Sequence, residues 1–420
     1  MSVVEAKKAI VVGGGIVGMC CALALQRQGH KVLVIDPARS LPAASWGNAG
    51  HIAIEQVEPL ASPAMLRSAL RRLMFFGGPL SLPPGQIASW LPFALRLARA
   101  ARPDRFARGK MALRALMVQA MPAWQRLSAS LEPRGLLIES GHAVVWHGAH
   151  AAQRGLKAWQ GADTGPARFH TASKQELAWL AGAMKSPPAG AILFENTGQV
   201  TDPGGILTAL DHAFRAAGGE RRAGLVHAIT VKGGMAELVL DGGEQLSGPH
   251  VVLAAGVESG ALIAPLGLKA PIIAERGYHI HTPAHQWPKG MPPVVFEEYS
   301  MIVTGFESGL RVAGFVEFGR RDAAADLRKW HKLERHAEAL GLPAIGPWHH
   351  WAGARPTLPD YLPAIGRAQW ARNLVYAFGH QHLGLTLAPI TGEIVAAMVQ
   401  EREPLVPVAP FDLERFGSYA

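Results

Sequence analysis

Three glycines near the N-terminus have the spacing of a loop that binds phosphate. Gly13, Gly15 and Gly18 stand in the order G-x-G-x-x-G, directly after the apolar run 9–12, which reads as a buried strand. Gly13 permits a tight turn, and Gly15 lets backbone amides approach a pyrophosphate at the start of the helix that follows. Gly18 lets that helix pack closely on the strand. The chemistry indicated is dinucleotide binding.

The segment after this helix extends the same unit. A second apolar run, 32–35, ends in Asp36, whose carboxylate can accept a hydrogen bond from a ribose 2′-hydroxyl and so favours adenosine over its 2′-phosphate. The loop "PARSLPAASWGNAGHIA" offers hydroxyl, amide and bare backbone groups, which suit a long flavin nucleotide better than NAD. We expect this unit to contact the nucleotide through Gly13, Gly15, Ile16, Val17, Gly18, Asp36, Pro37, Ser45, Asn48, Ala49 and Gly50.

A second candidate for chemistry is "GHQHLGLT", residues 379–386, in which His380 and His382 are two positions apart. Such a pair can ligate a metal, act in acid–base catalysis, or line a larger ligand. A metal site requires a third or fourth ligand at suitable spacing, and nothing in the sequence brings His349 or His350 close to the pair. We therefore expect no metal here, and we expect a loop that leads into the apolar helix "GLTLAPITGEIVAAMV".

Size and composition indicate a globular protein of two or three domains. The chain has 420 residues, of which 49% are hydrophobic and 17% charged. Mean hydropathy is high, at +0.12, yet no run of about 18 apolar residues predicts a membrane span. Cys20 and Cys21 are adjacent in the predicted first helix, where packing explains them better than a disulfide. With no signal-peptide pattern before the first strand, we expect a cytoplasmic location.

Basic residues are concentrated between positions 61 and 114. Asp104 is the only acid in this stretch, and the excess of basic residues there equals the +9 net charge of the whole chain. The stretch also contains "LMFF" and "WLPFALRLARAAR", in which large apolar residues alternate with basic ones. That mixture suits amphipathic helices packed on their own domain, or peripheral contact with the inner face of the cytoplasmic membrane. No nucleic-acid-binding signature accompanies the charge, so we expect no nucleic-acid partner.

The glycine fingerprint followed by "SWGNAG" resembles the D-amino acid oxidase (DAO) superfamily of FAD enzymes, and within it the bacterial D-amino acid and D-hydroxyproline dehydrogenases. Four further segments resemble that family in order along the chain. They are "TGQVTDPGGILTAL", "GPHVVLAAGVESGALIAPLGLKAPIIAERGY", "WAGARPTLPDYLPAIG" and "YAFGHQHLGLTLAPITGEIVAAM". The resemblance covers nearly the whole chain and is weakest between residues 61 and 185.

The resemblance implies an α/β fold of two interleaved domains. A Rossmann-like FAD-binding domain would take residues 1–58, 190–269 and 355–420. A substrate-binding domain, built on a large mixed or antiparallel sheet, would take 59–189 and 270–354 and include the basic stretch 61–114. Short apolar strands broken by Gly-Gly and Asp-Gly turns in 223–256 agree with this division.

The resemblance also implies an activity. With non-covalent FAD, the protein would oxidise D-amino acids, including cyclic D-imino acids such as cis-4-hydroxy-D-proline, by hydride transfer from Cα to flavin N5. The imine would hydrolyse to a 2-oxo acid or remain cyclic. The basic apolar stretch favours a membrane quinone or another carrier as electron acceptor. Two alternatives stay open: a glycine- or sarcosine-type oxidase that uses O₂, and the flavin subunit of a hetero-oligomeric opine or hydroxyproline dehydrogenase.

Particular residues take roles from the same resemblance. Arg355, in "GARPTLPD", matches the family's carboxylate-binding arginine, and a guanidinium can hold a carboxylate with two parallel hydrogen bonds; a structural ion pair is the alternative. Tyr299 corresponds to a pocket residue of related amine oxidases, with a core or surface role as the alternative. His51 is expected near the flavin and His382 at the substrate edge. Tyr278, at the domain crossover, reads as structural.

Further flavin contacts are expected from the middle and the end of the chain. They are Val226, Ala255, Gly256, His382, Leu383, Gly384, Leu385 and Thr386. The last of these residues open the final helix, whose N–H groups and dipole would stabilise negative charge on the reduced flavin.

Overall fold

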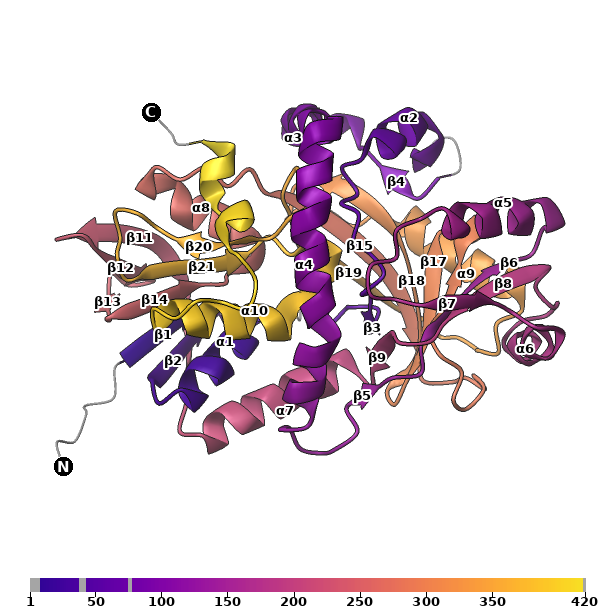
Figure 1. Cartoon of the computed structure of the whole chain (residues 1–420), viewed down its shortest axis with the longest axis horizontal. Coiled ribbons are helices and arrows are strands. Elements are labelled where there is room, and N and C mark those ends of the chain that lie inside the picture. Colours follow the sequence, from indigo (N-terminus) through magenta and orange to yellow (C-terminus); the bar gives the residue numbers. More distant parts are fainter. Residues whose placement is uncertain (1–7, 38–42, 75–77, 418–420) are drawn as a thin grey trace.

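The computed structural model describes residues 8–37, 43–74 and 78–417, and for 70–72 the backbone alone. Figure 1 shows two large sheets side by side, with the long helix α4 (Pro103–Ser128) crossing in front between them. Each half is assembled from segments far apart in the sequence, because the chain passes from one to the other several times. The mixed α/β fold expected from the sequence is confirmed.

A six-stranded sheet carries the predicted dinucleotide-binding unit. Its strands are β1 Lys8–Val12, β2 Lys31–Asp36, β10 Glu220–Ala223, β14 His250–Leu253, β20 Ala364–Arg367 and β21 Leu374–Phe378. They lie in the order β10-β2-β1-β14-β21-β20, and all neighbours are parallel except the edge pair β21 and β20. The central strands are apolar and almost entirely buried, as is usual where a parallel sheet is covered on both faces.

Helices cover one face of this sheet and a small sheet covers the other. The elements are α1 Ile16–Arg27, α7 Pro203–Ala216, β11 Val226–Lys232, β12 Met235–Leu240, β13 Gln245–Ser247, α8 Ser259–Ile263 and α10 Gly384–Val399. α1 packs between α7 and α10. The three-stranded sheet β11-β12-β13 and α8 share a second core with β1 and β14.

The backbones of α1 and α10 touch. A Cβ atom on Gly392 of α10 would lie 2.7 Å from the carbonyl oxygen of Cys20 in α1, so only glycine fits there. Cys20 and Cys21 are buried and unbridged, and burial raises the pKa of the Cys21 thiol to about 12. The helix-packing role expected for the cysteines is therefore what the structure shows. The helical window Gln381–Val399 is long and apolar enough to cross a bilayer, but 72% of it is buried inside the protein, as in a core helix.

The second large sheet has nine strands. They are β4 Leu80–Ser81, β6 His142–Trp146, β7 Phe169–Thr171, β8 Gly190–Phe194, β15 Ile273–Thr282, β16 Val294–Phe296, β17 Met301–Phe306, β18 Gly309–Gly319 and β19 His349–Thr357. Their order is β19-β15-β18-β17-β16-β6-β8-β7, with β4 paired to β18. Most neighbours are antiparallel, but β16 runs parallel to β6 and β4 parallel to β18, so the sheet is mixed.

Further elements surround this sheet. Their bounds are β3 His51–Ile52, β5 Leu137–Ile138, α5 Ala149–Gln160, α6 Lys174–Leu180, β9 Gly198–Val200 and α9 Leu327–Leu340. α9 packs on β15 and β18, while β3, β9 and β5 form a small sheet of their own. β8 belongs to the nine-stranded sheet, although the predicted boundary at 190 assigned it to the FAD-binding domain. β19 continues past the predicted boundary at 355, and the rest of the domain division stays a prediction.

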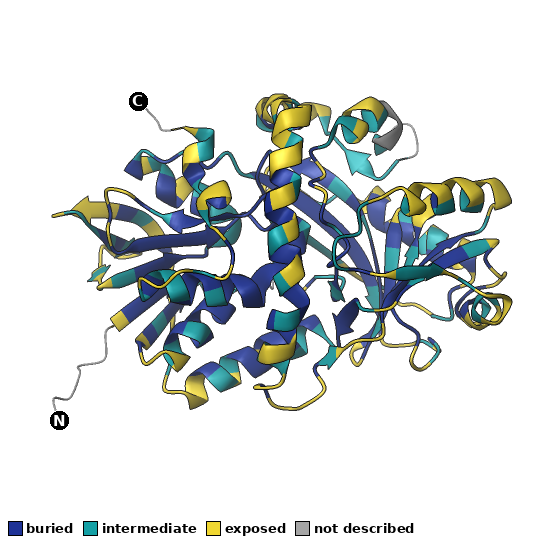
Figure 2. Ribbon diagram, in the orientation of Figure 1, coloured by how far each residue is buried: buried dark blue, intermediate teal, exposed yellow. Residues whose placement is uncertain are grey.

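The basic stretch 61–114 forms α2 (Pro63–Arg72), α3 (Ile87–Ala100) and the first half of α4. The inner face of α3 buries Phe93 and Leu97 with Phe318 of β18, so it packs on the protein. Its outer face leaves Leu91 and Leu95 exposed, at 42% and 58%. Figure 2 shows exposed residues along α3 and the upper part of α4, so this region also has a free outer surface.

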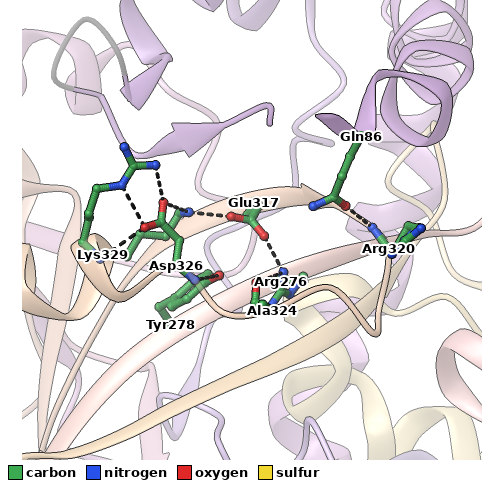
Figure 3. Close-up of polar contacts among 9 residues, drawn as sticks. Gln86, Arg276, Tyr278, Glu317, Arg320, Ala324, Asp326 and Lys329 are labelled. Carbon is green, nitrogen blue, oxygen red and sulfur yellow. Dashed lines mark hydrogen bonds and ion pairs between the residues drawn. The ribbon is translucent and has the colours of Figure 1, made fainter. Parts of the chain in front are cut away.

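A network of charged side chains joins α9 to the large sheet (Figure 3). Lys329 is fully buried, and its Nζ atom donates to Oε2 of Glu317 at 2.5 Å and to Oδ2 of Asp326 at 3.0 Å. Arg276 of β15 donates to the other oxygen of Glu317 at 2.6 Å. Tyr278, read as structural, is buried here and accepts a hydrogen bond from the N–H of Asp326. Two cations facing two carboxylates thus fix the start of α9 over the sheet.

Replacing Lys329 by methionine should lower the free energy of unfolding by about 3–5 kcal/mol, because Glu317 would keep a buried charge with one partner fewer. Urea unfolding followed by tryptophan fluorescence measures this. Arg328→Met is the matched control, since Arg328 also contacts Asp326 but is exposed, and we expect no measurable change from it. Equal losses in both variants would contradict a stabilising role for the buried lysine.

Candidate active site

The turn after β1 has the geometry that the glycine pattern predicts. Gly13 has a φ of 109°, and a Cβ atom there would lie 2.4 Å from the carbonyl oxygen of Ala254, so a side chain is excluded. A Cβ atom on Gly18 would lie 1.9 Å from the carbonyl oxygen of Gly13. Gly13 therefore shapes the turn, and Gly18 serves the packing of α1 on β1.

Asp36, at the end of β2, is held by the same turn. Its Oδ1 atom accepts a hydrogen bond from the backbone N–H of Gly14 at 2.9 Å, and its Oδ2 atom lies 3.5 Å from Nη2 of Arg221. Arg221 also pairs with Asp211 at 3.1 Å, so its charge is shared between two carboxylates. Asp36 remains at the cleft surface, where a ribose hydroxyl can reach it.

Ser45 connects the next loop to the start of α1. Its Oγ atom accepts a hydrogen bond from the N–H of Ile16 at 3.0 Å, while the Gly15 position at the helix start carries no capping side chain. The nearest non-neighbouring atom to a Cβ built on Gly15 would be that Oγ, at 3.4 Å, so the protein leaves the space before the helix open. Free amides and the positive end of a helix dipole suit a pyrophosphate, and the Ser45 hydroxyl can donate to one.

One cleft runs from this turn to the large sheet. It passes Val226 and Gly256, and at its other end it reaches Arg355 of β19 and the start of α10. The cleft has open amides at one end and a guanidinium at the other. This arrangement fits an extended dinucleotide, with the guanidinium beyond it free to bind a substrate. Of the residues expected to contact the nucleotide, the cleft is lined by Gly13, Gly15, Ile16, Val17, Asp36, Pro37, Ser45, Asn48, Val226, Ala255, Gly256, Gly384 and Leu385.

Six expected contacts lie outside the cleft lining: Gly18, Ala49, Gly50, His382, Leu383 and Thr386. Gly18 lies where α1 packs on β1. The Oγ1 atom of Thr386 accepts a hydrogen bond from the N–H of Ala53 at 3.0 Å, and Leu383 is buried. A Cβ atom on Gly50 would lie 2.4 Å from the ring of Phe306, so Gly50 faces the large sheet. The side chains of Leu383 and Thr386 are thus packed behind the cleft lining.

The large sheet holds the loop 45–50 by its carbonyl oxygens. Arg311 donates from Nη1 to Trp46 and Asn48, at 3.1 and 2.5 Å. His279 lies 3.1 Å from the carbonyl oxygen of Gly47, and Thr304 donates to that of Ala49 at 2.9 Å. Burial lowers the pKa of Arg311 to about 10, so it remains a cation at neutral pH. Sequence reasoning missed these groups, because no local pattern shows that β15, β17 and β18 face this loop.

Arg355 is oriented by a buried carboxylate. Its Nη1 atom lies 3.3 Å from Oε1 of Glu275 on the neighbouring strand β15, and its guanidinium lies over Gly277, where a Cβ atom would be 2.5 Å from Nη2. Glu275 is 2% exposed and also accepts from Thr357 at 2.9 Å and from Tyr361 at 3.1 Å. The ion-pair alternative for Arg355 is thus present together with a position in the cleft lining. The guanidinium of Arg355 has five N–H donors, and those that do not face Glu275 are left for a ligand.

The two histidines of the last loop have different surroundings. His380 lines the cleft, and its Nε2 atom lies 2.9 Å from Oγ1 of Thr391. His382 lies outside the lining and contacts Gln56. Burial lowers the pKa of His380 to about 3 and that of His382 to about 4, so both rings are neutral at pH 7. His382 was expected at the substrate edge, whereas the cleft wall contains His380.

His51 belongs to a buried cluster. Its Nδ1 atom lies 3.2 Å from the carbonyl oxygen of Gly198, and its Nε2 atom lies 3.2 Å from Oε1 of Glu55. The ring of His142 is 4.3 Å away, centroid to centroid. Burial opposes ionisation of Glu55, but the two histidines hold its pKa at about 2, and burial lowers the pKa of His142 to about 3. His51 does not line the cleft, and no local sequence pattern connects it to Glu55 or His142.

Tyr299 occupies a core position, which was the alternative to a pocket role. The residue precedes β17 and packs against the core beneath α9, with its ring 4.9 Å from that of His336 in α9 and 6.1 Å from that of His147. Met301, two positions further along the chain, is buried in the same core. The guanidinium of Arg355 lies over Gly277 of β15. The next residue of that strand is Tyr278, whose side chain is buried in the core beneath α9. Because neighbouring residues of a strand face opposite sides, Tyr299 and Arg355 lie on opposite faces of the sheet.

One cleft joins the open turn of a parallel sheet to an arginine on a large mixed sheet. These features are typical of a dinucleotide-dependent enzyme. The chain belongs to the DAO family of FAD-dependent oxidoreductases, whose model matches residues 8–398. FAD is its cofactor, and the cleft is the part of the structure that fits it.

Known proteins are similar to this chain over nearly their whole length. A D-amino-acid oxidase of Bradyrhizobium diazoefficiens is 29% identical over an alignment of 434 positions, which covers 98% of this chain and 99% of that protein. Glycine oxidase from Geobacillus kaustophilus superposes with a TM-score of 0.73 at 21% identity, covering 98% and 99% of the two chains. L-proline dehydrogenase from P. horikoshii gives a TM-score of 0.72 at 17% identity, covering 98% of each. These likenesses confirm the fold.

Gly15→Val should give a folded protein that lacks FAD. The protein itself has room for a Cβ atom there, whereas a branched side chain would fill the space that a pyrophosphate needs. The measurement is the ratio of flavin to protein absorbance after purification, together with a thermal unfolding curve. Gly18→Val is the comparison, and we expect it to lower the folded yield because its Cβ atom would overlap the Gly13 oxygen. A fully yellow Gly15→Val protein would refute the assignment.

Proposed function

We propose that this protein is an FAD-dependent dehydrogenase that oxidises D-amino acids, including cyclic D-imino acids such as cis-4-hydroxy-D-proline, and passes the electrons to a quinone or another carrier. The proposal rests on the position of Arg355, which lies at the end of the cleft away from the nucleotide-binding turn. Its guanidinium is paired with Glu275 and keeps further N–H donors for a ligand. The similarity to a protein named D-amino-acid oxidase supports a D-amino acid as the substrate.

Arg355 would bind and orient the substrate carboxylate. Glu275 fixes the plane of the guanidinium, and Thr357 and Tyr361 hold Glu275 in turn. Two parallel hydrogen bonds from a planar guanidinium set both the position and the angle of a carboxylate, which places the neighbouring Cα–H in a defined direction. Bound FAD supplies the acceptor for the hydride that leaves this carbon. The resulting imine hydrolyses in water to a 2-oxo acid, or persists where the ring makes it stable.

The start of α10, at the same end of the cleft as Arg355, would stabilise negative charge. Gly384 and Leu385 line the cleft, and the first N–H groups of a helix have no partner within it. They form the positive end of the helix dipole, which favours an anionic group beside it. His380 next to them is neutral and buried, so it shapes the wall without adding charge.

The outer surface of the stretch 61–114 supports a membrane quinone as acceptor. Arg96, Arg99 and Arg105 line a broad cleft between the α3–α4 corner and the C-terminal segment 406–417, and within the described structure none of the three has an ion-pair partner. Leu91 and Leu95 are exposed on the same helix, α3. Free cations beside exposed apolar side chains suit the headgroup layer of an anionic bilayer. A cytoplasmic enzyme at the inner face of the membrane follows from this proposal.

Molecular oxygen is the second candidate acceptor. The name of the curated relative, an oxidase, is the observation that favours it. The two proposals share the substrate half-reaction and differ only in what reoxidises the flavin, so one experiment separates them.

Anaerobic mixing of the yellow protein with D- and L-amino acids tests the substrate half-reaction. We expect D-proline and cis-4-hydroxy-D-proline to bleach the flavin absorbance, and the L-isomers to leave it unchanged. Slow recovery of the absorbance in air, and fast recovery with a soluble quinone, would support the dehydrogenase. Fast recovery in air would establish oxygen as the acceptor instead. No bleaching by any amine would contradict the proposed substrate for the isolated chain and direct attention to a second subunit.

In the same assay Arg355→Ala should keep FAD and require a substrate concentration higher by about 100-fold for half-maximal bleaching, because a charge-assisted pair of hydrogen bonds contributes roughly 3 kcal/mol. Arg222→Ala, which removes a surface arginine paired with Glu244, should behave like the unaltered protein. An unchanged half-saturating concentration in Arg355→Ala would disprove carboxylate binding at this residue.

Sedimentation with lipid vesicles tests the membrane surface. Replacing Arg96, Arg99 and Arg105 together by glutamine should weaken binding to vesicles that contain phosphatidylglycerol by about 100-fold, since each cation near an anionic surface contributes about 1 kcal/mol. The matched control replaces Arg134, Arg168 and Arg222, which are also exposed but lie outside that cleft. Equal binding of both triple variants, or equal binding to pure phosphatidylcholine, would rule out this surface.

A further inference from the structure

Three side chains that the proposed reaction does not use converge inside the protein. His51 comes from β3, Glu55 from the turn after it, and His142 from β6 of the large sheet. One potential ligand atom from each lies within 4.8 Å of the other two. The side chains of His51 and Glu55 are 7% and 4% exposed, and His142 is buried. Two imidazoles and one carboxylate thus share a small, almost fully buried volume.

The hydrogen bonds of His51 fix which ring nitrogen carries hydrogen. The carbonyl oxygen of Gly198, 3.2 Å from Nδ1, can only accept, so Nδ1 must donate to it. In the neutral ring Nε2 is then an acceptor, and it points at another acceptor, Oε1 of Glu55, at 3.2 Å. Two acceptors at that distance repel each other unless a positive charge lies between them.

A single proton on Nε2 of His51 would satisfy Oε1 of Glu55 but not the other carboxylate oxygen. The second oxygen of Glu55, Oε2, is buried and has no hydrogen-bond partner, and within the described structure no lysine or arginine pairs with this carboxylate. A buried, unpartnered carboxylate oxygen is costly. A divalent cation among the three side chains would contact Glu55 and both imidazoles at once, which a proton between two atoms does not do.

The surroundings hold both rings as a metal site requires. Thr197 and Gly198 are consecutive residues, and each engages the Nδ1 atom of one ring: Oγ1 of Thr197 lies 2.8 Å from that of His142. Partners of this kind orient ligating histidines and leave Nε2 free for the metal. The ring of His142 also stacks on Phe194 at 4.3 Å and 7°. The imidazoles are therefore oriented before any ion binds.

We propose that His51, Glu55 and His142 form a binding site for a divalent transition-metal ion of the zinc class, with one coordination position left for water. Nitrogen and carboxylate donors in this ratio suit Zn²⁺, whose sites with three protein ligands keep an open position. β3 directly follows the loop 45–50, and β6 belongs to the large sheet. An ion bound to both would tie the cofactor loop to the substrate-domain sheet. The site is independent of the identity of the substrate and of the electron acceptor.

Metal analysis of the holoenzyme tests this proposal. The yellow protein, produced with zinc in the medium and desalted, should contain about one zinc ion per FAD. Treatment with a chelator should remove the ion and lower the melting temperature, and added Zn²⁺ should restore both. Glu55→Gln and His142→Gln should each retain FAD, which reports a folded chain, and should lose zinc and the response to added Zn²⁺.

The control is His170→Gln. His170 also contacts two carboxylates, those of Glu176 at 2.9 Å and Glu195 at 3.2 Å, but it lies at the surface. This variant should keep the zinc content of the unaltered protein. Substoichiometric zinc in the unaltered protein, with no change in melting temperature on adding Zn²⁺, would overturn the proposal. Unchanged zinc content in both cluster variants would overturn it equally, because the ion would then be bound elsewhere.

Discussion

The loop 45–50 is held from two sides, and the arrangement of the active site depends on this double attachment. Ser45 accepts from the first turn of α1, which fixes the loop to the parallel sheet. Arg311 donates to two carbonyl oxygens of the loop, which fixes it to the large sheet. Because a buried backbone carbonyl without a donor costs free energy, these hydrogen bonds restrict the loop to this position. The two halves of the molecule are thereby aligned through the segment that forms the wall of the cofactor cleft.

The second constraint is the charge balance at the far end of the cleft. Arg355 is partly exposed to the cleft, while Glu275 behind it is fully buried and bound by three donors. A buried carboxylate needs such partners, and the partners in turn leave it little freedom to move. The guanidinium is therefore presented in one orientation. In the proposed function, this wall of the cleft orients the substrate carboxylate and takes no part in acid–base chemistry.

The sequence predicted the nucleotide half of the site better than the substrate half. Gly13, Gly15, Asp36 and Ser45 lie in one short stretch, where spacing alone implies a turn, a helix start and a strand end, and the structure places all four at the cleft. Arg355 was found through a sequence motif and also lies there. Tyr299 was assigned by its resemblance to a pocket residue of related amine oxidases, and a shift of one position along a strand is enough to move a side chain to the opposite face. Tyr299 packs under α9, in the core role that was the alternative.

By itself the sequence determined the parallel sheet, the phosphate-binding turn and the apolar last helix, because each follows from local periodicity and spacing. Only the tertiary structure decided which groups meet across the chain. Glu275 reaches Arg355 across 80 positions and Arg311 reaches Asn48 across 263, and Glu55 meets His142 only where β3 approaches β6. The physical reason is that a hydrogen bond or an ion pair depends on distance in space. Strand order and register fix that distance, and neither is encoded in the pattern of one segment.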